Sequence, residues 1–335
     1  MKAFDYVRPA DTRAAVRAVA DRPGARFLAG GTNLVDHLKL GVAAPDLLVD
    51  VRRLPLDTVE VYDDAVGTGL RIGANVRNSD LAAHPVIRSS YPVIARALLS
   101  GASGQIRHQA TTAGNLLQRT RCVYFQDVTT PCNKREPGTG CSAREGYGRY
   151  NAILGASDGC VATHPSDLAV ALAALESTVV VTGGDGERRV PFEELHRLPG
   201  DRPDADTTLA PDELVLAVEV PSTGATRCST YRKVRDRASY AFALVSVAAA
   251  LHLEDGAVRD VRVAWGGVAP NPWRARALEA ALIGRPLTGD AVLAAVDAEL
   301  GAAQTDEQTA YKVPMLRGAT LHTLTELAEL AEEGR

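Results

Sequence analysis

Three of the five cysteines in this 335-residue chain lie close together, in the stretch RTRCVYFQDVTTPCNKREPGTGC that ends at Cys141. With Cys160 they form the spacing C-x9-C-x8-C-x18-C. Four thiolates can hold a tetrahedral zinc ion, or a [4Fe–4S] cubane with one ligand per iron, and this spacing does not choose between them. Cysteines packed as small apolar side chains are the plain alternative. Against it, Cys132 and Cys141 stand among polar residues, Pro and Gly, where no core is expected.

Two turns rich in small residues could bind an anion. The first, LAGGTNL, follows a strand pattern and precedes a helical one, so its backbone N–H groups could point at a phosphate. The second, ATTAGNLLQRT, offers hydroxyl, amide and backbone donors. Neither matches G-x-G-x-x-G or a P-loop. Either turn alone is more often simple turn chemistry, and the two together suggest loops that close over an elongated phosphorylated ligand.

Composition excludes several classes of protein. With 37 basic and 41 acidic residues the chain has no basic stripe for a phosphate backbone, so we expect no nucleic-acid partner. No apolar run is long enough to span a membrane, and the N-terminus lacks the apolar region of a secretory signal. An odd number of cysteines without a signal argues against a disulfide framework and favours a reducing compartment, hence the cytoplasm.

The elements that must position these residues alternate between strand and helix. Helical spacing is clear in DTRAAVRAVADRPG and in HPSDLAVALAALES, where Ser166 or Asp167 is the expected N-cap. ARFL, DLLVDV, RIGANV, TVVVTGG and ELVLAVEVP are expected strands. Residues 119 to 160 show little periodicity. An insertion of this length usually has its own function, or its own stabilising cross-link or metal. From Thr226 onward we expect three strands, among them a buried strand in the apolar run that starts at Tyr240, and then helices.

Five stretches, in this order and spacing, resemble the FAD-binding subunit of molybdenum hydroxylases, the xanthine dehydrogenase and aldehyde oxidoreductase family. They are LAGGTNL, QIRHQATTAGNLLQRTRC, HPSDLAVALAAL, ELVLAVEVP and YRKVRDRASYAFALVSVA. The resemblance covers nearly the whole chain and implies an α+β fold. Residues 1–224 would form a PCMH, vanillyl-alcohol-oxidase-like FAD-binding domain, with two α/β subdomains that divide near residue 55 and a cluster-binding insertion over about 119–160. Residues 225–335 would form an α+β domain with a three-stranded antiparallel sheet and helices.

The resemblance also implies roles for single residues. The first turn would hold the FAD pyrophosphate on backbone N–H groups, with side-chain contacts from its Thr and Asn; its members are Phe27, Leu28, Ala29, Gly30, Gly31, Thr32, Asn33 and Leu34. Thr111, Gly114 and Asn115 would form the second phosphate loop. Asp167 would accept hydrogen bonds from the FAD sugar region and Val215 would pack near the flavin. Lys233 would approach the polar edge of the ring, where a cation stabilises the reduced, anionic flavin.

The insertion looks most like the branch of the family whose flavin subunit carries an additional [4Fe–4S] cluster. Its ligands would be Cys122, Cys132, Cys141 and Cys160. One departure from the family pattern concerns the second turn, where Ala113 replaces the first of two glycines. A Cβ is tolerated there only if φ is negative.

The implied function is electron transfer, as an FAD-dependent oxidoreductase subunit without a catalytic side chain of its own. Electrons would come from [2Fe–2S] clusters on a small partner subunit, with the substrate oxidised on a molybdopterin-binding large subunit, and would leave through FAD to an external acceptor. Two alternatives stay open: a stand-alone FAD and iron–sulfur oxidoreductase, and a zinc-stabilised binding protein. A partner with an export signal could also carry the chain to the periplasm.

Overall fold

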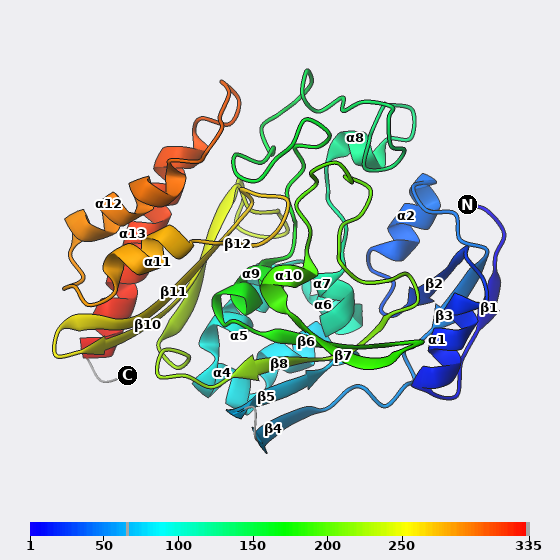
Figure 1. Ribbon diagram of the computed structural model, residues 1–335, viewed down its shortest axis with the longest axis horizontal. Coiled ribbons are helices and arrows are strands. Elements are labelled where there is room, and N and C mark those ends of the chain that lie inside the picture. Colours follow the sequence, from blue (N-terminus) through cyan, green and yellow to red (C-terminus); the bar gives the residue numbers. More distant parts are fainter. Residues whose placement is uncertain (65–66, 333–335) are drawn as a thin grey trace.

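The chain is organised around three β-sheets, as Figure 1 shows for this computed structural model, which describes residues 1–64 and 67–332. The first sheet is parallel, in the order β1-β3-β2. Its elements are β1 (Asp5–Val7), α1 (Thr12–Ala20), β2 (Ala25–Leu28), α2 (Leu34–Leu40) and β3 (Leu47–Asp50). The next strand begins at Val59, so residue 55, our predicted subdomain division, lies in the link between two sheets.

The second sheet is antiparallel, in the order β4-β5-β8-β6-β7. Its strands are β4 (Val59–Asp64), β5 (Gly67–Gly73), β6 (Thr178–Gly183), β7 (Gly186–Pro191) and β8 (Leu214–Pro221). Helices connect and cover it: α3 (Asn78–Ala83), α4 (Pro85–Ser90), α5 (Pro92–Ser100), α6 (Gly104–Gln109), α7 (Thr112–Leu116), α9 (Asp167–Ala174) and α10 (Phe192–Leu195). The strand β8 therefore returns from a point far along the chain to the middle of the sheet.

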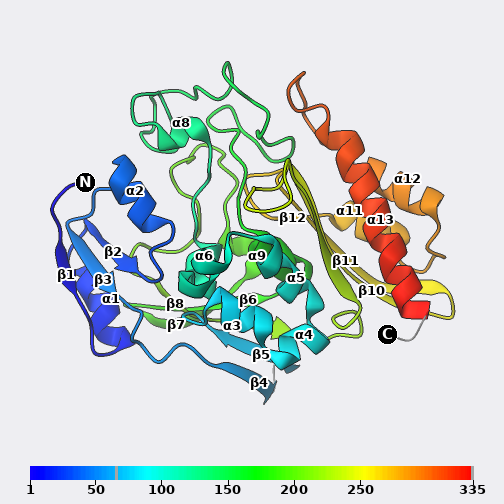
Figure 2. The ribbon, with the colours of Figure 1, turned by 180° about the vertical axis from the view of Figure 1, so that it is seen from behind.

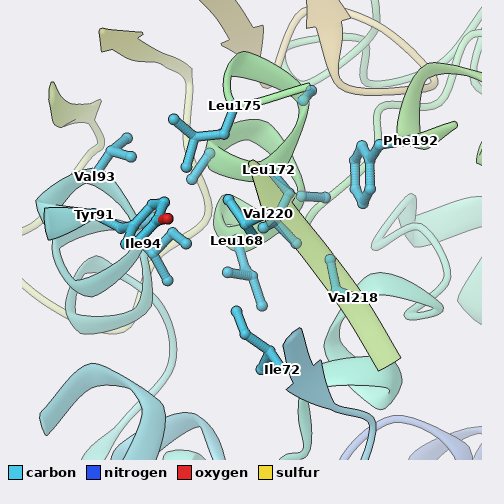
Figure 3. Packing of buried hydrophobic residues seen from close by; sticks show 14 of the residues in the cluster. Ile72, Tyr91, Val93, Ile94, Leu168, Leu172, Leu175, Phe192, Val218 and Val220 are labelled. Carbon is cyan, nitrogen blue, oxygen red and sulfur yellow. The ribbon is translucent and has the colours of Figure 1, made fainter. Parts of the chain in front are cut away.

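Helix α9 is the centre of the largest core. It is apolar on all sides, with seven of its eight residues buried, as expected for a helix surrounded by protein. Its N-cap is Ser166, whose hydroxyl accepts a hydrogen bond from the N–H of Ala169 at 3.0 Å. Figure 3 shows Leu168 and Leu172 of this helix among side chains of α5 and β8. Packing on every side fixes the N-terminus of α9, where Asp167 is placed.

The third sheet is antiparallel and has four strands, in the order β12-β11-β10-β9. They are β9 (Ser229–Val234), β10 (Val245–Glu254), β11 (Ala257–Gly266) and β12 (Trp273–Arg274). We predicted three strands; β12 is a two-residue strand that pairs with the end of β11 and carries no periodic signal. The strand predicted from Tyr240 begins at Val245, because the preceding segment is a loop in which Tyr240 has φ +52°.

Helices α11 (Arg276–Leu282) and α13 (Lys312–Glu332) pack on this sheet, and α12 (Gly289–Leu300) packs on these two helices (Figure 2). Helices α5 and α9 also contact its strands, so β10 is buried from Val245 to Leu251. The last three residues of the predicted 225–335 domain, 333–335, lie outside the described part of the chain. Among the described helices, none has the length and apolarity needed to cross a membrane.

Candidate functional site

The turn between β2 and α2 lies directly against the second small-residue turn. A Cβ built on Gly30 would stand 2.0 Å from the carbonyl oxygen of Gln109, so only glycine permits this approach. Gly31 has φ +75°, the left-handed region that glycine adopts without strain. The structure therefore brings together the two turns that the sequence suggested as a pair.

The second turn is the capped start of α7. Its N-cap is Thr111, whose hydroxyl accepts a hydrogen bond from the N–H of Gly114 at 3.3 Å. Ala113 lies inside α7 and is not among the described residues with positive φ, so its Cβ is unstrained. The side-chain oxygen of Asn115 accepts a hydrogen bond from Ser166 at 2.7 Å, which ties this turn to the start of α9.

Two adjoining cavities run along these turns. The smaller, of about 160 Å³, is lined by Thr111, Gly114, Val215 and the first turn apart from Leu28, which lines neither cavity. The larger, of about 640 Å³, is lined by Asn115, Asp167 and Lys233 among others. Thr32, Asn33 and Gly114 line both. Val215 of β8 thus lines the smaller cavity together with the first turn, whereas Lys233 lines the larger one.

Asp167 and Lys233 form a buried ion pair at 2.8 Å on the wall of the larger cavity. The Lys233 side chain is 3% exposed, and its ammonium also donates to the carbonyl of Ser100 at 3.3 Å. The hydroxyl of Tyr231 donates to the other carboxylate oxygen of Asp167. Burial and the charge of Asp167 raise the pKa of Tyr231 well above its usual value. The charge of Lys233 is therefore largely compensated by the residue beside it.

Several residues that line the larger cavity have a buried polar atom without a hydrogen-bond partner among the described residues; these atoms include Asn78 Oδ1, Arg121 Nε and His164 Nε2. Buried polar atoms usually have a partner, so these atoms indicate a ligand. Burial lowers the pKa of Arg121, whose guanidinium also lies over the ring of Phe242 at 5.4 Å. A cavity of this size with a few polar groups is typical of a cofactor site. The residues present fit an elongated dinucleotide that spans both cavities.

The four cysteines of the insertion come together around a third cavity, of about 10 Å³. Cys132 and Cys141 face each other in an isolated antiparallel bridge, and Cys160 forms a bridge with Ser157. Burial raises the pKa of the Cys122 and Cys160 thiols. In the described part of the chain, no group of three or more His, Cys, Asp or Glu side chains is placed to hold a metal ion. The thiol donors converge, but they do not form a ready site for a single ion.

Side chains hold the insertion together, since α8 (Val123–Gln126) is its one helix among the described residues. The amide oxygen of Asn133 accepts hydrogen bonds from the N–H groups of Gly138 and Gly140. The guanidinium of Arg135 donates to three carbonyl groups, those of Tyr124, Phe125 and Thr130. These braces lie on either side of Lys134. Sequence reasoning missed them, because side-chain to main-chain bonds leave no periodic signal.

Both ends of the insertion are fastened to the rest of the protein. At its start, the N–H of Arg119 donates to the side-chain oxygen of Asn33 at 3.0 Å, so this oxygen is already engaged. Near its end, the fully buried ammonium of Lys312 donates to the carbonyls of Asn151 and Gly267, at 2.6 and 2.7 Å. Asn151 and Gly267 both line the larger cavity. Cys122 lines the larger cavity as well as the cysteine cavity.

Comparison with known protein families matches nearly the whole chain. Residues 2–223 match a family described as the FAD binding domain in molybdopterin dehydrogenase, and residues 229–326 match the CO dehydrogenase flavoprotein C-terminal domain. The chain belongs to the FAD-binding subunits of the molybdenum hydroxylase family. The FAD-binding domain match contains both turns, the insertion and Asp167, whereas Lys233 lies in the C-terminal match.

Relatives of this family are similar over most of their length. The aldehyde oxidoreductase FAD-binding subunit PaoB of Escherichia coli is 53% identical over 84% of this chain and 86% of its own. The glyceraldehyde dehydrogenase medium chain of Sulfolobus acidocaldarius is 28% identical over 86% and 84%. Among solved structures, carbon monoxide dehydrogenase of Hydrogenophaga pseudoflava superposes with a TM-score of 0.73 at 25% identity, over 96% of each chain. As an FAD-binding subunit of this family, the chain is part of an oxidoreductase.

Proposed function

We propose that this chain binds one FAD across the two cavities and serves as the electron-transfer subunit of an aldehyde oxidoreductase-type molybdenum hydroxylase. The observation that carries the proposal is the pair of adjoining cavities, lined by two glycine-containing turns that contact each other at Gly30. FAD supplies the ability to accept electrons singly from iron–sulfur centres and to release them singly or in pairs. The 53% identity with PaoB favours the aldehyde oxidoreductase type.

The nucleotide end of FAD would lie in the smaller cavity, along the turn that contains Phe27, Leu28, Ala29, Gly30, Gly31, Thr32, Asn33 and Leu34. Backbone N–H groups there would bind the pyrophosphate together with Thr111 and Gly114. A phosphate accepts hydrogen bonds, so it would use the amide nitrogen of Asn33, which also lies 3.3 Å from Nε2 of His37, while the N–H of Arg119 holds the amide oxygen. Val215 would pack against the nucleotide end, since it lines the same cavity.

The flavin end would lie in the larger cavity, beside Asn115, Asp167 and Lys233. Asp167 can accept a hydrogen bond from the sugar chain while it pairs with Lys233. Lys233 would favour negative charge on the ring, moderated by this pairing. The side chains around the cavity thus orient the cofactor and set its charge environment. None of them need perform chemistry on a substrate.

The proposal includes a [4Fe–4S] cluster held by Cys122, Cys132, Cys141 and Cys160. Support comes from the convergence of four thiols on one cavity, in an insertion with almost no regular structure. A cubane takes one thiolate per iron, so its ligand sulfurs stand further apart than those around a single zinc ion. The lack of a single-ion geometry in the described residues is therefore compatible with a cluster.

As partners we propose a molybdopterin-binding large subunit and a small subunit with [2Fe–2S] clusters. Support comes from the names of relatives, which are called FAD-binding subunits or medium chains. This chain would connect the clusters of the small subunit to an external acceptor. We place the assembly in the cytoplasm, or in the periplasm where a partner carries an export signal.

The test is an anaerobic purification of the full chain, followed by an absorption spectrum and the quantification of flavin, iron, sulfide and zinc. We expect about one FAD, four irons and four sulfides per chain. Zinc without flavin would contradict the proposal and favour a structural binding protein. FAD without iron would restrict it to the flavin function. Co-expression with the candidate large and small subunits then tests assembly, by size-exclusion chromatography.

A further inference from the structure

Lys134 lines the cysteine cavity beside the four cysteines, and among the described residues that line this cavity it is the one with a basic or acidic side chain. Lys134 follows Cys132 by two positions and is 8% exposed. Its ammonium donates to the carbonyl of Pro203 at 2.8 Å and to the carboxylate of Asp206. A cation is therefore buried at the edge of the thiol site.

The residue type is informative in a chain with so few lysines. Five of the 37 basic residues are lysine, and the others are arginine. Lysine carries a compact charge with three donors, whereas arginine presents a wide planar fork. Beside a small cavity, a compact ammonium can approach a buried anion without the space that a guanidinium needs.

Asp206 controls how much of this charge remains. It accepts hydrogen bonds from both Lys134 and Arg119, and the guanidinium of Arg119 also lies over the ring of Phe125 at 4.7 Å. Burial raises the pKa of Asp206, but the charges of Arg119 and Lys134 outweigh this and hold it below its usual value. One carboxylate thus faces two cations, and the group keeps a net positive charge beside the cysteines.

We propose that Lys134 is the positively charged partner of the iron–sulfur cluster, that Asp206 sets its strength, and that together they set the reduction potential of the cluster. The inference rests on the cluster assignment made above. Reduction adds one electron to a buried group that is already negative, because four thiolates surround it. A nearby cation stabilises the reduced form more than the oxidised form, so it raises the potential. Lys134 is a positioning residue and touches no substrate.

The test is a redox titration of the anaerobically purified complex, followed by electron paramagnetic resonance. The cluster signal is the one that disappears in Cys141→Ser. We expect Lys134→Met to lower its midpoint potential, with at least a tenfold change in the reduction equilibrium, about 59 mV for one electron. Asp206→Asn should raise the potential, because both cations lose their counter-charge. Lys39→Met, which removes an exposed lysine, is the matched control and should leave the potential unchanged.

The opposite signs separate a charge effect from a structural one. Shifts in the same direction for both variants, or no shift in either, would overturn the role of Lys134 while the cluster assignment stands. If Lys134→Met loses the cluster, Asp206→Asn decides: a raised potential supports the inference and an unchanged one overturns it. If no signal depends on Cys141 in the wild-type complex, the cluster proposal fails and this inference fails with it.

Discussion

The smaller and larger cavities, in which we place FAD, and the insertion over residues 119–160 are neighbouring regions that are stabilised in different ways. The cavities are lined by turns between regular elements, and main-chain contacts hold these turns in place: Gly30 packs on Gln109, and Thr111 caps α7. The insertion has one four-residue helix and is held by side chains such as Asn133 and Arg135 that bond to the main chain. From this difference we expect the first site to be preorganised for FAD, and the insertion to depend for its stability on the cluster proposed above.

The most severe test of this comparison is Gly30→Ala. The added Cβ would meet the main chain of Gln109, which cannot move without displacing the second turn. We expect the purified variant to contain almost no FAD, by absorbance, while its cluster is retained. Gly104→Ala is the control, because nothing lies within 4 Å of a Cβ at that position. Normal flavin content in Gly30→Ala would show that the turns are not preorganised.

The converse test is Cys141→Ser. We expect the loss of about four irons per chain and faster proteolysis within residues 119–160, because the side-chain braces alone do not hold the insertion. The affinity for FAD should fall by a smaller factor than the iron content does. Cys228→Ser, which changes a cysteine whose thiol contacts the carbonyl of Leu327 in the C-terminal domain, should keep its iron. An insertion that resists proteolysis without iron would mean that the two regions are equally self-sufficient.

A third test concerns Lys312, which joins the two regions. Burial, and to a lesser degree Arg149, lower its pKa to about 7, and Asp306 opposes this. In an unfolded chain a lysine has a pKa of about 10.4. At a pH between the two pKa values, the unfolded chain therefore binds the proton more tightly than the folded protein does. The free energy of unfolding therefore rises with pH across this window. From pH 7 to 9, we expect Lys312→Met to lose about 2 kcal/mol of this rise in urea titrations.

An equal pH dependence in wild type and Lys312→Met would contradict this buried-ammonium account. The variant leaves the carbonyls of Asn151 and Gly267 without the ammonium, so its stability at a single pH is not the deciding quantity. The deciding quantity is the change in the free energy of unfolding between the two pH values.

The smallest expected effect concerns the flavin potential. Lys233→Met leaves Asp167 with its negative charge in the cavity, so we expect a lower potential, by about tenfold in the equilibrium or about 30 mV for two electrons. The double variant Asp167→Asn, Lys233→Met removes both charges and should shift the potential less. Spectroelectrochemistry of the bound flavin measures both. An unchanged potential in the single variant would remove the electrostatic role of Lys233.

Local chemistry made part of the site predictable. The start of α9 at its Ser166 cap and the turn between β2 and α2 follow from capping and glycine rules, and the structure has both. The α+β class and the FAD-binding subunit family are confirmed, with the correction that the last sheet has four strands. The domain boundaries, the residue roles and the cluster ligands stay predictions.

The rest was not predictable, because it depends on contacts between residues far apart in the chain. The pair of Asp167 and Lys233 joins residues 66 positions apart, and that of Arg119 and Asp206 residues 87 apart. Buried ion pairs of this kind follow from tertiary packing, and no period or spacing in the sequence encodes them. Tyr240 is a further example: an apolar run predicted a strand there, but the loop beside the larger cavity has φ +52° at this residue.

The hydrogen bond from Lys312 to Asn151 also constrains the order in which the protein can be made. The two residues are 161 positions apart, and Lys312 begins the last helix, α13. During synthesis the first domains of a chain fold before the end has left the ribosome. The wall of the larger cavity at Asn151 and Gly267 is therefore completed only after α13 has been translated. We therefore expect FAD to bind this cavity with full affinity only once α13 has been translated and packed.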